Sequence, residues 1–363
     1  MRLTVSRSLL SDALRKVQNL AGKSALPILS NVKIEAAGDK VKFTTTDLDI
    51  SEVVEITCAV LEEGAITLPA KLLSDAIARA AEGDVAISVA PGTSQAVIRA
   101  GSSTFKMTGL PAENFPVLPK REEDATSFSI PQEVMKGLIR RTAYAMSKDD
   151  TRRTLKGLHM KFAEGTLTMV GTDGRRLAVT EYTPDPPYEF SMEYTIPEKA
   201  IGELSRHLGT SGDVTFSQSK TQMVATFNNE VTLFSKLVDD AYPNYAAVIP
   251  QHNNIEIVVD RLALISAIER VGVFSEENSM KFDIANNEIK LSSATESGNC
   301  DEPVPVKYEG EPIAITFNHA YILDTLKALD DDEVKFLFLN GHSPVMIKSS
   351  VPGLAVIMPL RVN

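Results

Sequence analysis

One short stretch, GTDGRR at residues 171–176, places a carboxylate beside two arginines and could bind a phosphate group. Related acidic turns occur twice more, as TTDLD at residues 45–49 and ATESG at residues 294–298. Superposing the three turns aligns Asp47, Asp173 and Glu296. A turn that recurs in this way is more typical of architecture than of an active site, so we interpret it as a repeated structural element.

The remaining candidates for chemistry do not form a catalytic pattern. The five histidines show no Cys/His/Asp grouping with the spacing of a metal site or a catalytic triad: His159, His207, His252, His319 and His342. The sequence also has no Gly-rich phosphate loop and no nucleophile elbow. We therefore predict a protein that is not an enzyme and that carries no cofactor and no metal.

Amphipathic helix patterns divide the chain into three repeats. Apolar residues three and four apart predict a first helix at residues 6–17, 131–142 and 260–271. A second helix is predicted at residues 68–80, 196–208 and 317–329. The two helices and the acidic turn agree on a period of about 120–130 residues, which is too long for a solenoid unit. We predict three domains with the boundaries 1–120, 121–252 and 253–363.

Between the helices lie short runs of alternating polar and apolar residues, such as NVKIEAAGDKVKFTTTD, bounded by Gly, Asp and Asn. This pattern indicates antiparallel hairpins. Each repeat is therefore an α+β domain with two helices packed on antiparallel sheets. No run reaches the roughly 18 apolar residues of a membrane span, and no signal peptide is evident. Cys58 and Cys300 show no metal spacing, so we expect a reduced, cytoplasmic protein without a membrane partner.

The charge is segregated along the chain, whose net charge is −11. Residues 6–23 and 131–148 each carry a net +3, while the other four helical stretches balance to zero. Each first helix has a basic residue near its end, at Lys16, Arg141 and Arg270. These cations could simply decorate solvated helix faces. If the helices share one face, however, that face is positive and could hold phosphates without reading sequence.

The chain ends on AVIMPLRVN, residues 355–363, an unusually apolar terminus. Termini are commonly polar and frayed. This stretch is either an inner strand that completes a sheet or the lining of a site that exposes apolar residues to a partner.

Four further blocks give the chain a close resemblance to one family: LPILSN (26–31), TDGRRLAV (172–179), SKLVDDAYPNY (235–245) and GLAVIMPLRV (353–362). With this spacing the sequence resembles the bacterial sliding clamp, the beta subunit of DNA polymerase III, over essentially its whole length. The resemblance implies three domains of the DNA clamp fold and a ring-forming, head-to-tail homodimer. In such a ring, helices line a hole around double-stranded DNA and sheets form the outside.

The resemblance also implies a hydrophobic groove between the second and third domains, to which the C-terminal residues contribute. This groove would take short linear motifs from the polymerase III alpha subunit, the clamp loader delta subunit, other polymerases and repair proteins. Carried onto this sequence, the groove residues are Arg152, Leu155, Thr172, Gly174, Arg175, Arg176, Leu177, Pro243, Val248, Met346, Val356, Met358, Pro359 and Leu360. Met and Leu suit adaptable apolar pockets.

For DNA, the family pattern points to Lys23, Lys148, Arg152 and Arg153, and the repeated helix position adds Lys16, Arg141 and Arg270. The dimer contacts carry over to Phe105 and Met107 on one protomer and to Val273 and Phe274 on the other. Without the resemblance, this apolar quartet would equally well be core.

The function implied is that of a DNA sliding clamp, which confers processivity on the replicative polymerase. The alternative from the residues alone is a protein-only scaffold whose groove binds peptides and whose helices never meet DNA. The recurrent basic residue is the feature that favours the clamp.

Overall fold

The computed structural model describes residues 1–22, 24–119, 125–228 and 230–361. Its contacts form two compact units, one made of residues 1–133 and 202–237 and the other of residues 134–201 and 238–363. Helices α3 (Gln132–Ala143) and α4 (Glu198–His207) contain two of the three points at which the chain passes from one unit to the other, and the third lies between Leu237 and Val238. No helix in the described part of the chain is long and apolar enough to cross a membrane.

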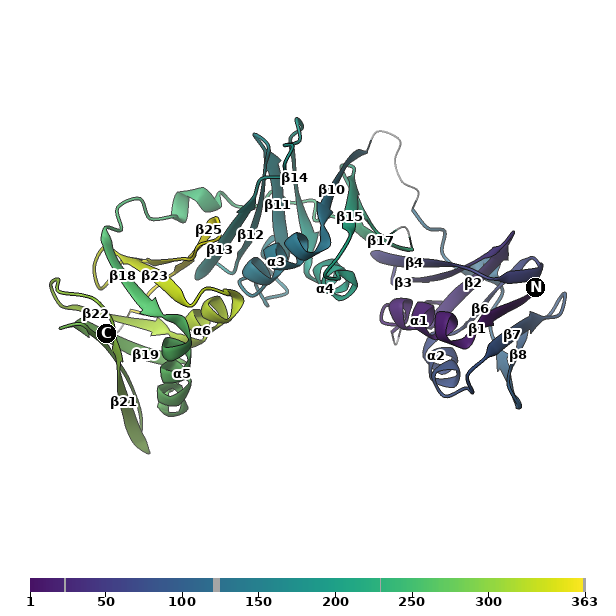
Figure 1. The fold of residues 1–363 in the computed structure, drawn as a ribbon, viewed down its shortest axis with the longest axis horizontal. Helices are drawn as coiled ribbons and strands as arrows, with labels where there is room; N and C mark the ends of the chain where they lie inside the picture. The colour runs from purple at the N-terminus through teal and green to yellow at the C-terminus, as the bar shows by residue number, and fades with distance from the viewer. Residues whose placement is uncertain (23, 120–124, 229, 362–363) are drawn as a thin grey trace. The chain divides into compact units, whose positions relative to one another are not determined.

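The first unit contains helices α1 (Arg7–Val17) and α2 (Ala70–Ala78), which lie side by side (Figure 1). Its short 3₁₀ helices are η1 (Pro27–Ser30) and η2 (Ala112–Asn114). Its strands are β1 (Arg2–Ser6), β2 (Asn31–Ala37), β3 (Lys40–Thr46), β4 (Ile50–Thr57), β5 (Ala59–Glu62), β6 (Gly64–Pro69), β7 (Asp84–Val89), β8 (Gln95–Ala100), β9 (Ser103–Thr108), β10 (Thr126–Pro131), β15 (Asp213–Gln218), β16 (Gln222–Phe227) and β17 (Val231–Lys236).

The second unit contains helices α5 (Arg261–Val271) and α6 (His319–Ala328), again side by side. Its 3₁₀ helices are η3 (Arg153–Lys156), η4 (Tyr245–Val248) and η5 (Gly272–Phe274). Its strands are β11 (Gly157–Ala163), β12 (Thr166–Thr172), β13 (Arg176–Tyr182), β14 (Met192–Pro197), β18 (Ile255–Asp260), β19 (Ser279–Ala285), β20 (Glu288–Thr295), β21 (Gly298–Pro305), β22 (Ile313–Asn318), β23 (Glu333–Phe338), β24 (Val345–Lys348) and β25 (Gly353–Ile357). All six predicted helices are confirmed, each within two residues at both ends.

Each unit combines one eight-stranded antiparallel sheet with a smaller one. In the first unit the orders are β10-β15-β16-β17-β4-β3-β2-β6 and β5-β1-β7-β8-β9. In the second they are β14-β11-β12-β13-β25-β24-β23-β18 and β21-β20-β19-β22. Each eight-stranded sheet joins two sequence repeats, through the pairing of β17 with β4 and of β25 with β13. The last strand of one repeat thus hydrogen-bonds to the fourth strand of the repeat before it.

The helices form where capping and apolar spacing coincide. Ser6 caps α1 by accepting a hydrogen bond from the Leu9 amide, and Asp260 caps α5 through the Ala263 amide at 2.7 Å. One face of each helix is buried against the sheets; on α5 this face consists of Leu264, Ala267, Ile268 and Val271. Burying a side chain of the size of Leu contributes about 1.5–3 kcal/mol to the stability of the fold. Burial of one face therefore fixes the orientation of each helix, and with it the position of the polar residues at the helix ends.

A buried ionic cluster links β4 to α4 inside the first unit. The Glu52 side chain is fully buried, and its two carboxylate oxygens accept hydrogen bonds from Arg206 at 2.8 and 3.0 Å. His207 Nε2 lies 2.7 Å from the same carboxylate, and Arg206 also pairs with Glu203. Among the described residues, Glu52, Glu203 and His207 are a group whose ligand atoms are close enough for a metal ion. Because the Arg206 guanidinium already pairs with both carboxylates, we interpret the cluster as an ion-pair network.

Candidate binding sites

A threonine hydroxyl holds the recurring acidic turn in all three repeats. In the second repeat, Thr172 Oγ1 donates to the Arg176 carbonyl at 2.6 Å and accepts from the Gly174 amide at 3.1 Å. Thr46 in the first repeat makes the same pair of bonds, with the Ile50 carbonyl and the Leu48 amide. Thr295 in the third accepts from the Ser297 amide in the same way, but it donates to the Gly298 carbonyl, which is three residues on instead of four. The turn is therefore a structural element of each repeat, as predicted.

In the second repeat this turn is rigid and leaves main chain exposed. Asp173 Oδ1 accepts the amides of Arg175 and Arg176 at 2.8 and 3.0 Å. Gly174 adopts φ +84°, a region that favours glycine. Gly174 and the Arg175 side chain are both exposed. The turn thus presents an exposed arginine on a backbone that is already ordered.

The apolar C-terminus lies beside this turn. Strand β25 pairs with β13, placing Val356 opposite Leu177, and the Met358 amide donates to the Arg175 carbonyl at 3.0 Å. Farther on, the Leu360 amide donates to the Thr316 carbonyl at 2.8 Å. Residues up to 357 therefore complete a sheet, as the first interpretation of the terminus has it. Met358 and Leu360 follow with 45% and 38% of their surface exposed, and their contact with a partner stays a prediction.

Beneath the exposed residues lies a small apolar cluster, separate from the main core. Its buried members are Val170, Leu177, Val179, Met346 and Val356. Partly buried residues packed against the cluster are Tyr242, Tyr245, Ile249, Leu337 and Leu354. The structure thus brings the predicted groove residues Leu177, Met346 and Val356 together as a buried layer, whereas Val248 is exposed at its edge.

A surface hollow adjoins the turn. It is lined by Thr151, Arg152, Arg153, Thr154, Leu155, Asp240 and Pro243. Three predicted groove residues, Arg152, Leu155 and Pro243, therefore share one hollow. Arg152 Nη1 donates to the Asp173 carbonyl at 3.0 Å, which ties the hollow to the turn. The predicted groove residues therefore lie in three neighbouring features of the second unit: the hollow, the turn and the apolar C-terminal stretch.

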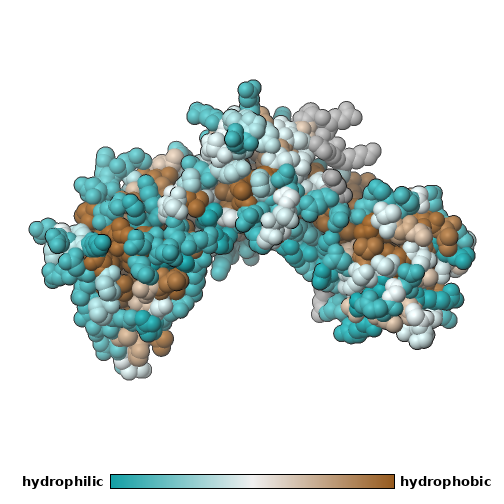
Figure 2. All heavy atoms as spheres, viewed as in Figure 1, coloured by the Kyte–Doolittle hydropathy of each residue, from teal (hydrophilic) through white to brown (hydrophobic). Residues whose placement is uncertain are grey.

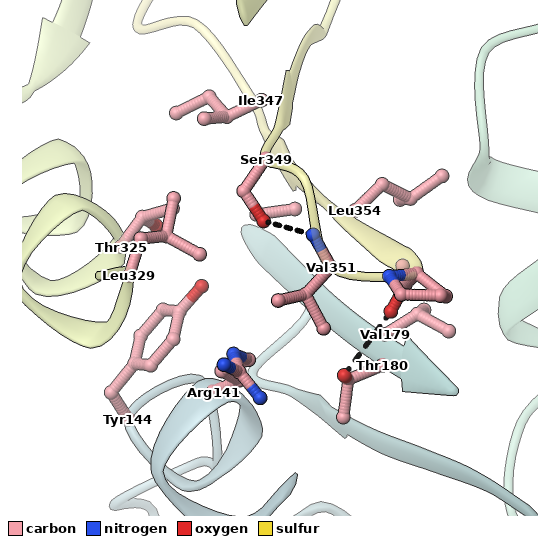
Figure 3. Close-up of a pocket in the computed structure, with 13 residues that line it drawn as sticks. Arg141, Tyr144, Val179, Thr180, Thr325, Leu329, Ile347, Ser349, Val351 and Leu354 are labelled. Atoms are coloured by element: carbon pink, nitrogen blue, oxygen red, sulfur yellow. Dashed lines mark hydrogen bonds between the residues drawn. The ribbon is translucent and has the colours of Figure 1, made fainter. Parts of the chain in front are cut away.

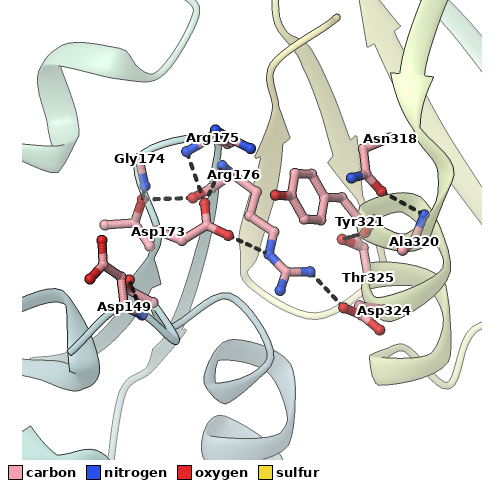
Figure 4. A network of polar contacts seen from close by, with 12 residues as sticks. Asp149, Asp173, Gly174, Arg175, Arg176, Asn318, Ala320, Tyr321, Asp324 and Thr325 are labelled. Atoms are coloured by element: carbon pink, nitrogen blue, oxygen red, sulfur yellow. Dashed lines mark hydrogen bonds and ion pairs between the residues drawn. The ribbon is translucent and has the colours of Figure 1, made fainter. Parts of the chain in front are cut away.

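Arg176 differs from the other predicted groove residues because its guanidinium is buried, with 6% of the side chain exposed (Figure 4). It pairs with Asp173 at 3.1 Å and with Asp324 of α6 at 2.7 Å. It also lies over the Tyr321 ring, 4.4 Å from the centroid. The side chain therefore connects the turn to α6. Sequence reasoning missed Asp324 and Tyr321, since nothing in the α6 pattern marks them as partners of a residue 148 positions away.

A small cavity lies behind the C-terminal strand, lined in part by Arg141, Tyr144, Thr180, Thr325 and Ser349 (Figure 3). Burial raises the pKa of Tyr144 to about 12, so this hydroxyl stays protonated. Burial also lowers the pKa of Arg141, and Arg140 beside it acts in the same direction. Arg141 is thus half buried at a cavity, and only part of this predicted DNA contact reaches solvent.

Sequence reasoning also missed His159, which packs under the groove. Its ring stacks on Tyr242, the neighbour of Pro243, with centroids 4.5 Å apart. Burial lowers the pKa of His159, although Glu193 opposes the shift. The imidazole is therefore neutral at ordinary pH and acts as a flat packing surface.

The predicted DNA contacts occupy different environments. Lys148, Arg152 and Arg153 are exposed in the loop before and within η3. Lys16, Arg141 and Arg270 lie near the ends of α1, α3 and α5, and each pairs with a carboxylate. Lys23 lies outside the described residues.

The predicted dimer contacts occupy sheet edges. Phe105 and Met107 belong to β9, the edge strand of the five-stranded sheet, where Met107 is buried and Phe105 half-buried. Val273 and Phe274 form η5, and Val273 is 76% exposed. Phe274 lies against Gly298, where the edge strand β21 begins. Figure 2 shows hydrophobic residues interspersed with polar ones on the surface of both units.

Three repeats with helices on antiparallel sheets, and exposed apolar residues beside an ordered turn, are typical of a binding protein of the clamp type. Family models of the DNA polymerase III beta subunit match residues 1–119 (N-terminal domain), 129–244 (central domain) and 246–361 (C-terminal domain). The chain belongs to the DNA polymerase III beta subunit family, the bacterial beta sliding clamps.

Individual relatives agree. The beta sliding clamp of Chlamydia trachomatis serovar D is 33% identical over 369 residues, covering 100% of this chain and 88% of the relative. The crystal structure of the Pseudomonas aeruginosa beta subunit matches with a TM-score of 0.95 and 31% identity, covering both chains completely. A structure of the sliding clamp from that organism bound to griselimycin has the same TM-score and 30% identity.

The fold class and function expected from the sequence are thereby confirmed. The chain has the three-domain clamp fold and the function of its family, a non-catalytic sliding clamp of DNA replication, with DNA and polymerase as partners and a dimeric assembly. The protein-only scaffold is not favoured.

Proposed function

We propose that two copies of this chain close head to tail into a ring around double-stranded DNA, with domains at 1–120, 121–252 and 253–363. The sheet pattern carries this proposal. Strand β17 ends the second repeat and pairs with β4, and β25 ends the third and pairs with β13. The first repeat ends on β9, which therefore corresponds to β17 and β25. The fourth strand of the third repeat is β21, which corresponds to β4 and β13.

Among the described strands, β9 and β21 are edges of their sheets. Exposed edges are templates for pairing with another chain. Pairing β9 of one protomer with β21 of the other would supply the missing junction, with Phe105 and Met107 on one side and Val273 and Phe274 on the other. Such a contact is heterologous, and it must either close or polymerise. Two three-repeat protomers close it with six domains.

In the ring, the basic residues Lys23, Lys148, Arg152, Arg153, Lys16, Arg141 and Arg270 would meet the phosphates of the duplex without reading its sequence. Linear motifs from the polymerase III alpha subunit, the clamp loader delta subunit, other polymerases and repair proteins would bind the groove. Arg175 supplies it with an exposed cation, and Met358 and Leu360 with exposed apolar surface. Because the DNA that it would encircle lies in the bacterial cytoplasm, we propose that the protein acts there.

The test of the ring is retention on DNA after loading with a clamp loader and ATP. We expect the protein to stay on closed circles at a salt concentration that screens ordinary charge contacts. After linearisation it should leave through the free ends. Equal release from circular and linear DNA would overturn the proposal that the protein encircles DNA.

The groove is tested by truncating its exposed apolar residues. We expect the double variant Met358→Ala, Leu360→Ala to bind a labelled alpha-subunit motif peptide about tenfold more weakly, which corresponds to about 1.4 kcal/mol. Fluorescence anisotropy measures the affinity. Leu61→Ala is the matched control, since Leu61 is exposed and lies on β5 in the other unit. Unchanged peptide affinity in the double variant would remove the terminus from the groove.

A further inference from the structure

The basic residues at the repeated helix position are all held by carboxylates. Lys16 lies 2.9 Å from Asp12 and 3.3 Å from Glu230. Arg141 and its neighbour Arg140 share Asp330. Arg270 makes a two-pronged contact with Glu302, in which Nε lies 2.9 Å from Oε2. At the repeated helix position, the positive charge of each basic residue is therefore balanced by at least one neighbouring carboxylate.

The compensating acids do not come from the sequence repeat. Glu230 precedes β17, Asp330 follows α6, and Glu302 lies within β21. These are three different positions of the repeat, so the pairing is not a by-product of a duplicated motif. Each of the three cations therefore pairs with a carboxylate from a different place in the fold.

Asp330 and Glu302 are ionised at ordinary pH. The hydrogen bond from Arg140 holds the pKa of Asp330 below its usual range, and that from Arg270 does the same for Glu302. Burial opposes the change at Lys16, yet its bonds to Asp12 and Glu230 raise the pKa of its ammonium group. Each pair is therefore a true cation–anion contact.

The loop cations contrast with these. Lys148 and Arg153 are exposed, and within the described part of the chain the structure gives neither a carboxylate partner within 4.0 Å. Arg152 lies 3.6 Å from Asp149 at its closest carboxylate contact. The helices also carry Lys71 and Lys136, exposed and likewise without such a partner among the described residues. Uncompensated charge is thus available mainly away from the repeated position.

We infer that Glu230, Asp330 and Glu302 weaken the grip of the repeated helix cations on duplex phosphates, so that the DNA is held mainly by the loop cations and by the uncompensated helix lysines. The inference rests on the proposed ring. An exposed ion pair is weak, so a phosphate can reach these cations, but the neighbouring carboxylate repels it. At distances beyond a Debye length of about 8 Å, the opposite charges of each ion pair nearly cancel, so the pair hardly attracts the DNA. The three acids therefore determine how freely the ring moves along DNA.

The test compares two triple variants of equal net charge. The lining variant is Glu230→Gln, Asp330→Asn, Glu302→Gln. The control variant is Glu55→Gln, Glu256→Gln, Asp283→Asn, which neutralises acids that pair with strand lysines Lys40, Lys335 and Lys281. Both raise the net charge by three. Affinity for a linear 30-base-pair duplex is measured by anisotropy between 50 and 200 mM salt.

We expect the lining variant to bind several-fold more tightly at 50 mM salt than the control variant. Its plot of log affinity against log salt should be steeper by about 0.9 for each cation freed. Diffusion of the loaded ring along DNA should be slower. Because Glu302 lies on an edge strand, the double variant Glu230→Gln, Asp330→Asn gives the answer if the triple does not fold or dimerise.

Equal affinities and equal slopes for the lining and control variants would overturn the inference. Retention of the unmodified protein on closed circular DNA distinguishes failure of this inference from failure of the proposed ring. If the unmodified protein leaves closed and linear DNA equally, the proposed ring fails. If it stays on circles and the two variants are indistinguishable, only the role of the three acids fails.

Discussion

Replacing Arg176 with methionine is expected to lower the free energy of unfolding of the chain by about 3 kcal/mol, the lower end of the cost of breaking a buried ion pair. The guanidinium joins Asp173 to Asp324, and only 6% of the side chain is exposed. Methionine keeps the contact with the Tyr321 ring but leaves the Asp173 carboxylate without its cation. Urea denaturation followed by circular dichroism measures the change.

The same substitution should weaken the groove. Asp173 orders the turn by accepting two amides, and the turn holds Met358 through the Arg175 carbonyl. We expect faster amide exchange at residues 174–176 and at Met358, and weaker peptide binding. For stability and amide exchange, Arg175→Met is the matched control because Arg175 is exposed, and exposed substitutions change stability by about 0.5 kcal/mol or less. Equal effects of the two variants on stability and amide exchange would show that the buried guanidinium does not brace the turn.

The second large effect is expected at Glu52. Glu52→Ala leaves Arg206 and His207 without the carboxylate that both contact, and should destabilise the chain by about 3 kcal/mol. Glu52→Gln keeps an oxygen at the same place and should cost clearly less. If glutamine and alanine destabilise equally, the cluster is not held together by this acceptor.

The pH dependence of the Glu52 contribution has a definite sign. Burial raises the pKa of Glu52 above its ordinary value of 4.5, against the opposing effects of His207 and Arg206. The folded state therefore binds a proton more tightly than the unfolded state at this position. The resulting stabilisation is complete below pH 4.5 and is lost as the pH rises through the raised pKa. Measured from pH 4.5 to 7.5, the stability of Glu52→Gln relative to the unmodified protein should rise and then level off. A constant difference would contradict the raised pKa.

The sequence predicts those features that depend on local pattern. The apolar periodicity locates the six helices, because burial of one face imposes the spacing. The alignment of Asp47, Asp173 and Glu296 locates a real turn, because in each repeat the hydroxyl of the preceding threonine accepts the amide two residues on and donates to a carbonyl of the same turn. The resemblance identifies which apolar residues gather beside the turn.

Contacts between distant residues could not be predicted from one sequence. Glu230 lies 214 positions from Lys16, and only the fold brings them together. The same holds for Arg176, whose type suggested a peptide contact but whose guanidinium is enclosed between Asp173, Asp324 and Tyr321. An arginine is read from sequence as exposed charge, and its burial is decided by partners that no local pattern specifies.

The pairing of β17 with β4 and of β25 with β13 has a consequence for fragments of this chain. A piece that ends near residue 120 retains β4 but lacks β17, so the β4 edge would be left bare in the middle of what was a sheet. A piece that begins near residue 253 retains β25 but lacks its partner β13, so the β25 edge would be unpaired in the same way. Repeats separated at the boundaries of their sequence motifs would therefore expose unpaired strand edges, which are templates for pairing with other chains.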